Sequence, residues 1–145
     1  TTPVPIVTSS FVSASSVLAN ITGLSQNVIT GRKYIFESAL WISAPSIAGT
    51  KFAVSGTAVA YASSVLYNLN FTNEATSADI INARHSVLGG STGQDGTTAG
   101  FCFIKGMIYT SVAGTLTTQF AQNVQIPSSV ATVLPGSYFN VELIT

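Results

Sequence analysis

Hydrophobic and polar positions alternate along much of this chain, as they do in β-strands. The clearest alternating run extends from Tyr34 to Ser43. One face of this run carries Tyr34, Phe36, Ser38, Leu40 and Ile42, and the other carries Ile35, Glu37, Ala39, Trp41 and Ser43. Both faces are largely apolar, so a strand of this kind must be covered on both sides. In a chain of 145 residues, we expect a neighbouring subunit to cover one of them.

Six further segments alternate in the same way. They span residues 51–60, 65–71, 80–88, 101–110, 115–122 and 137–144, and weaker runs lie near Ile6, Val17 and Val28. Short segments rich in turn-forming residues separate them, as at Asn73–Ser77 and Pro135–Gly136. About eight short strands divided by turns predict an all-β fold, either a sandwich or a barrel.

The start of the chain has a different pattern from the rest. Residues 1–16 include Pro3 and Pro5, and proline fixes φ and lacks a backbone N–H donor. We therefore expect residues 1–16 to form an extended N-terminal arm that lies on a neighbouring molecule. Residues 17–145 are expected to form a single β-sandwich domain, because no internal repeat or charged linker marks a second one. The first residues also lack the pattern of a secretory signal.

The longest segment without a strand pattern is residues 89–100, which contain five glycines. Glycine adds no side chain to a core and bends freely, so we expect an exposed loop. Its uncharged polar groups suit contact with a sugar or protein surface, and a flexible connector is the alternative. The contact residues predicted here are Ser91, Thr92, Gln94, Asp95 and Thr97. A phosphate-binding P-loop is excluded, because neither a Gly-Lys-Ser or Gly-Lys-Thr sequence nor a helix pattern follows.

Charge is scarce, since only ten residues are charged, five basic and five acidic, and the formal net charge at pH 7 is zero. Nucleic acid and anionic lipid require clustered Lys and Arg, so we expect no nucleic-acid partner. Apolar runs stay far below the roughly 18 residues of a spanning helix, and we expect no membrane insertion. So few charges leave large neutral patches, which we expect subunits or a larger shell to bury.

Candidate catalytic groups are also few. His85 is followed by Ser86 and preceded by Asp79, but adjacent strand residues point to opposite faces, which argues against a hydrolytic triad. We interpret His85 as a surface or subunit-contact group that titrates near neutral pH. A glycosidase needs two carboxyl groups about 5 to 10 Å apart. The available acids are Glu37, Glu74, Asp79, Asp95 and Glu142, and strand carboxylates more often face solvent or pair with a cation. We predict no enzymatic activity.

Cysteine and histidine are too few for a disulfide or an ordinary protein zinc site. Cys102 is the one cysteine and His85 the one histidine. Cys102 lies between Phe101 and Phe103 without a basic neighbour, which is typical of a small buried hydrophobic residue. We therefore predict no metal and no cofactor.

Three segments combine turn and strand signals in a distinctive way. They are Thr30–Phe36 (TGRKYIF), Ala113–Asn123 (AGTLTTQFAQN) and Val133–Val141 (VLPGSYFNV). Together they resemble a pattern of small trimeric jelly-roll virion structural proteins of tailed bacteriophages. The resemblance covers about residues 22 to 145 and is weaker between Tyr61 and Thr98.

This resemblance implies a jelly-roll-like antiparallel β-sandwich of about eight strands that forms homotrimers. It implies a non-enzymatic protein on the surface of the phage particle, which binds itself and the major capsid protein or other virion proteins. A capsid decoration (cement) protein is the prediction. The alternative is a receptor-binding domain of a tail fibre or spike, with a host-surface glycan or protein as its partner. The predicted subunit or lattice contacts are Pro3, Pro5, Tyr34, Phe36 and Trp41.

Overall fold

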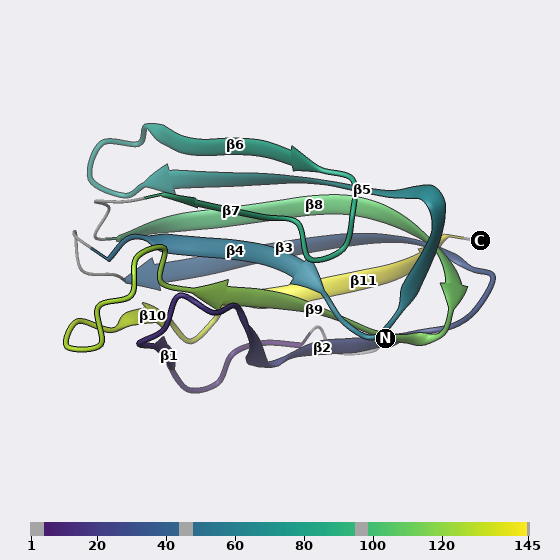
Figure 1. The fold of residues 1–145 in the computed structure, drawn as a ribbon, viewed down its shortest axis with the longest axis horizontal. Helices are drawn as coiled ribbons and strands as arrows, with labels where there is room; N and C mark the ends of the chain where they lie inside the picture. The colour runs from purple at the N-terminus through teal and green to yellow at the C-terminus, as the bar shows by residue number, and fades with distance from the viewer. Residues whose placement is uncertain (1–4, 44–47, 95–98, 145) are drawn as a thin grey trace.

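The structure is a computed structural model that describes residues 5–43, 48–94 and 99–144. Every regular element in these ranges is a β-strand (Figure 1). The strands are β1 (Phe11–Ser13), β2 (Ala19–Val28), β3 (Lys33–Ser43), β4 (Thr50–Ser55), β5 (Val59–Asn73), β6 (Asp79–His85), β7 (Ser91–Gln94), β8 (Ala99–Val112), β9 (Gly114–Ala121), β10 (Ala131–Val133) and β11 (Tyr138–Ile144). They form two antiparallel sheets that pack as a sandwich, which confirms the predicted fold class.

The two sheets have the strand order of a jelly roll. Sheet A joins β1, β10, β3, β8, β5 and β6 in that order, and β11 pairs along β3 beside β10. Sheet B has the order β2, β9, β4, β7. From β1 to β10 the chain alternates between the sheets, except at the β5–β6 hairpin, which extends sheet A. Figure 1 shows this hairpin along one long side of the molecule, opposite β1 and β2.

The core lies between the sheets and is built from alternate residues of each strand. On β3, the face that carries Tyr34, Phe36, Ser38, Leu40 and Ile42 is buried throughout and faces the core. Aromatic rings join the layers, since Phe52 of β4 stacks on Phe71 of β5 with ring centroids 5.4 Å apart. The burial of Tyr34 and Phe36 corrects their prediction as subunit or lattice contacts, because both side chains face the opposite sheet of their own domain.

Residues 51–60 do not form the single strand that their alternation predicts. β4 ends at Ser55, and the chain crosses from sheet B to sheet A before β5 begins at Val59. Gly56 makes this crossing with a φ of +137°, and a Cβ there would overlap the carbonyl oxygen of Thr115. Only glycine fits such a position. The alternation continues through the crossing and therefore does not reveal it.

The predicted loop at residues 89–100 contains a strand, which corrects that prediction. β7 pairs with β4 from Ala53↔Ser91 to Thr50↔Gln94 at the edge of sheet B. The edge of β4 offers backbone N–H and C=O groups that need partners, and β7 supplies them despite its glycine content. Because β7 and the three-residue β1 and β10 were not predicted as strands, the described ranges hold eleven strands instead of about eight.

The described part of the N-terminal segment runs along its own molecule. The Val7 N–H donates to the Ser137 carbonyl at 2.8 Å, and the Gly136 N–H donates to the Val7 carbonyl at 2.9 Å. The carbonyl of Pro5 accepts from the Phe139 N–H at 3.2 Å, and β1 pairs with β10. Pro3 lies outside the described residues. Contact of this segment with a neighbouring molecule stays a prediction.

Gly106 on β8 lets two aromatic side chains pack closely against the strand. A Cβ at this position would lie 2.6 Å from Cζ of Phe36 and 2.5 Å from Cβ of Tyr67. We predict that Gly106→Ala lowers the free energy of unfolding by about 2 kcal/mol, as overpacking of a core does. The shift in urea midpoint measures this loss. The control Ser25→Ala, at an exposed strand position of sheet B, changes stability by less than about 0.5 kcal/mol. Equal stability of the two variants would contradict the prediction.

Candidate interaction surface

The outward faces of the two sheets differ in chemistry. Sheet B presents amides and hydroxyls, such as Asn20 and Gln119, whose side chains are hydrogen-bonded to each other at 2.9 Å. Sheet A presents large apolar side chains that are 42% to 56% exposed, namely Ile35, Trp41, Leu66, Phe103 and Met107. We call this surface the outer face of sheet A. Covering this apolar surface with another protein would be favourable, because it would remove apolar side chains from water.

Strand pairing arranges the apolar side chains of this face in rows. Ile35 on β3, Met107 on β8 and Leu66 on β5 are register partners and form one row across three strands. Trp41 and Phe101 form another, with ring centroids 4.8 Å apart in an edge-to-face arrangement. Trp41 is exposed, as a contact residue must be. Its role as a subunit or lattice contact stays a prediction.

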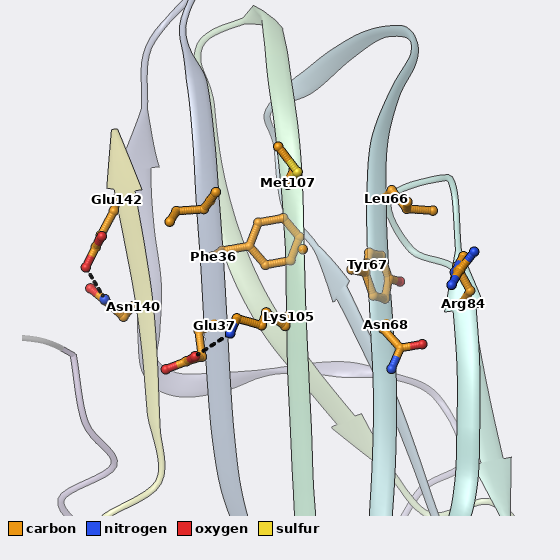
Figure 2. A pocket seen from close by; sticks show the side chains of 12 residues that line it. Phe36, Glu37, Leu66, Tyr67, Asn68, Arg84, Lys105, Met107, Asn140 and Glu142 are labelled. Carbon is orange, nitrogen blue, oxygen red and sulfur yellow. Dashed lines mark hydrogen bonds and ion pairs between the residues drawn. The ribbon is translucent and has the colours of Figure 1, made fainter. Parts of the chain in front are cut away.

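A charged row crosses the face between the apolar rows. Glu37 on β3 and Lys105 on β8 are register partners, and Lys105 Nζ lies 3.7 Å from Glu37 Oε2 (Figure 2). The Tyr138 hydroxyl donates to Glu37 Oε1 at 2.9 Å. Burial raises the pKa of Tyr138, and the hydrogen bond to Glu37 and its negative charge raise it further. Glu37 is therefore held in place from two sides.

A shallow groove of about 740 Å³ lies over this part of the face. Its lining includes Glu37 and Glu142 from β3 and β11, and Lys105 and Arg84 from β8 and β6. Figure 2 shows the acidic pair and Arg84 on opposite sides of the groove, with Lys105 reaching toward Glu37. Four of the ten charged residues of the chain line this one groove, and their charges cancel.

The fold brings Glu37 and Glu142 together on the outer face of sheet A. Glu142 pairs with Ile35 and Asn140 pairs with Glu37, so the two carboxylates are diagonal neighbours on adjacent strands. Diagonal positions of this kind lie about 7 to 8 Å apart. Asn140 Nδ2 donates to Glu142 Oε1 at 2.9 Å, so each carboxylate already has a partner within the chain. Sequence spacing alone gave no sign that these residues meet.

His85 links the two sheets from within the molecule. Its Nε2 lies 2.7 Å from the Thr92 hydroxyl on β7, and its ring packs on Tyr67 with centroids 5.3 Å apart. The Tyr67 hydroxyl in turn donates to the Gly90 carbonyl. Asp79 lies at the other end of β6, and six residues along a strand at about 3.3 Å each place it about 20 Å away. The triad that the sequence argued against does not form.

The other candidate residues lie on β7, on β8 or outside the described residues. Ser91 is exposed on β7, whereas Thr92 is partly buried and bound to His85. Asp95 and Thr97 lie outside the described residues, as does the side chain of Gln94, and the contact role of this segment stays a prediction. Cys102 is fully buried, and burial raises the pKa of its thiol well above the ordinary value. It is the small buried hydrophobic residue that its neighbours predict.

Across the described residues, no three His, Cys, Asp or Glu side chains gather closely enough to hold a metal ion. None of the described segments is a helix long and apolar enough to cross a membrane.

Comparison with known proteins returns little similarity. No protein-family model and no curated protein matches the chain. Two solved structures align with it, those of the Gx and Gt strains of infectious bursal disease virus, at 14% and 15% identity. The alignments cover 96% and 97% of this chain, which spans 37% and 40% of those chains, and the TM-score is 0.23 in both. A TM-score at this level does not define a shared fold.

Burial lowers the pKa of His85 in the folded protein. The folded state therefore binds a proton more weakly than the unfolded chain, whose histidine titrates near pH 6.5. The associated stability is fully present above about pH 6.5 and is lost as the pH falls toward the lowered folded pKa. We predict that the free energy of unfolding falls more between about pH 7.5 and 5.5 in the wild type than in His85→Gln. Urea unfolding at several pH values measures this difference, and parallel profiles would contradict it.

Proposed function

We propose that this chain is a non-enzymatic structural protein of a virion. More narrowly, we propose a head decoration protein that forms trimers and cements the capsid of a tailed bacteriophage. The observation that carries the proposal is the outer face of sheet A, where large apolar side chains lie exposed around a groove of zero net charge. A surface of this kind favours lasting association with other proteins.

The jelly-roll strand order also supports a structural role. Jelly rolls recur in viral capsid proteins, although they occur in lectins as well, so the fold alone does not decide the function. The three segments that resemble phage virion proteins belong to this scaffold. Residues 30–36 lead into β3, residues 113–123 contain β9, and residues 133–141 join β10 to β11. The resemblance therefore supports a common architecture.

A decoration protein stabilises a shell by burying surface across the junctions between capsid subunits. Three linked copies bind at three points, and once the first is bound the others bind at high effective concentration. The scarcity of charge in this chain leaves apolar burial and neutral hydrogen bonds as the main sources of binding free energy. No reaction step is needed for this activity.

We predict that the purified protein cosediments with capsids of its own virus that lack it, and that it raises their melting temperature in calorimetry. Immunogold labelling of intact particles then locates it. Label over the head supports the decoration role. Label confined to the tail, together with binding to host cells or glycans without capsids, supports the receptor-binding alternative. An absence of both capsid binding and particle label would overturn a virion role.

The binding of this protein to capsids should depend only weakly on salt. Screening weakens interactions between charged groups, and the chain has only ten charged residues. We predict that the Kd for capsids changes by less than about threefold between 0.05 and 0.5 M NaCl. Cosedimentation at several salt concentrations measures it. A tenfold loss of affinity across this range would indicate that charge pairs drive the binding.

A further inference from the structure

We propose that copies of this chain bind one another through the outer face of sheet A, with β3 of one copy against β8 of the next. This inference rests on the proposed function only in that both require copies to associate. It adds a surface and an alignment for one contact between two copies. The occupant of the face is thus a second copy of the chain, and the reason lies in the register of two paired strands.

β3 and β8 pair over eleven residues, from Lys33↔Tyr109 to Ser43↔Ala99. Consider a rotation axis that lies above the outer face of the sheet, runs parallel to these strands and is centred between them. Rotation about this axis does not change the position of any residue along the strand direction, which we call its height. The rotation therefore brings each outward residue of β3 against its own register partner on β8 of the neighbouring copy. This holds for a closed assembly of two copies related by a two-fold axis.

The side chains that meet in this way are complementary at four successive heights. They are Ile35 with Met107, Glu37 with Lys105, Ala39 with Phe103, and Trp41 with Phe101. Apolar groups meet at three heights, and opposite charges meet at the fourth. The small side chain of Ala39 also leaves room for the exposed ring of Phe103.

Glu37 and Lys105 can each bind a second opposite charge from another copy. Although Lys105 and Glu37 interact within one chain, their side chains remain 81% and 46% exposed. In the contact, each carboxylate lies between its own ammonium group and that of the neighbour. A shift of two residues along the strands would place Glu37 against Phe103 or Met107, and a charge left against apolar groups is costly. The pair therefore selects one alignment.

The face is large enough for a stable contact. Residues spaced about 3.3 Å along a strand, on strands about 4.8 Å apart, give β11, β3, β8, β5 and β6 together roughly 700 to 900 Å². A standard protein interface buries about 800 Å² on each partner.

Charge reversal tests this contact without capsids. Glu37→Lys and Lys105→Glu each place like charges against each other in every contact, so we expect at least tenfold weaker association by light scattering. An equimolar mixture of the two variants restores opposite charges between unlike copies. It should re-form the assemblies, whereas the ion pair within each chain stays broken. Glu74→Lys, a charge reversal in the turn after β5, is the matched control and should behave as wild type.

Circular dichroism checks that each variant is folded. The variant Trp41→Ser tests the same contact without changing a charge. It too should weaken association, while Val17→Ser, at an exposed apolar position outside the face, should not. An assembly unaffected by the charge reversals, or variants that stay single chains of 15.0 kDa after mixing, would overturn the inference. So would a wild-type protein that stays a single chain at micromolar concentration. Capsid binding is measured separately, so the proposed virion role stands or falls on its own result.

Discussion

The antiparallel register between β3 and β8 is the constraint on which the rest of the structure depends. Side chains alternate along both strands, so a slip of one residue between them would turn the core-facing residues of one strand to the outer side of the sheet. In the observed register, Phe36 lies in the core and Glu37 lies outside beside Lys105. Gly106 belongs to the same register, because it lies opposite Phe36 where a larger residue would displace the ring. The packed core and the charged row on the surface therefore have one origin.

Most polar groups that carry reactivity in other proteins have structural partners here. His85 is bound to Thr92 across the two sheets, and Glu37 is bound to Tyr138 and Lys105. Cys102 is enclosed in the core. Glu37 thereby joins strands that lie far apart in the sequence, and His85 joins two strands of different sheets. Their arrangement supports the proposal of a scaffold protein, whose task is to hold a surface in a defined shape.

The scarcity of charge gives the surface its character. Hydroxyl and amide groups make sheet B polar with little charge, while sheet A leaves large apolar side chains exposed. A hydrophobic surface alone binds many partners in many orientations, because the hydrophobic effect is non-directional. The few charges gathered at the groove add direction, since each must find an opposite partner. This combination suits a protein that assembles with defined neighbours.

Sequence reasoning identified most of the long strands and the two faces of β3, because side-chain alternation is a local property of the strand backbone. The amino-acid sequence by itself therefore determined an all-β antiparallel sandwich with two apolar faces on its central strand. Whether Tyr34 or Trp41 faced the core was not a local question, since it depends on which side sheet B covers. The crossing at Gly56 and the pairing of β7 with β4 also depend on backbone groups distant in the chain. Only the tertiary structure decided these points, because burial and strand partnership arise from what packs against a segment from elsewhere in the molecule.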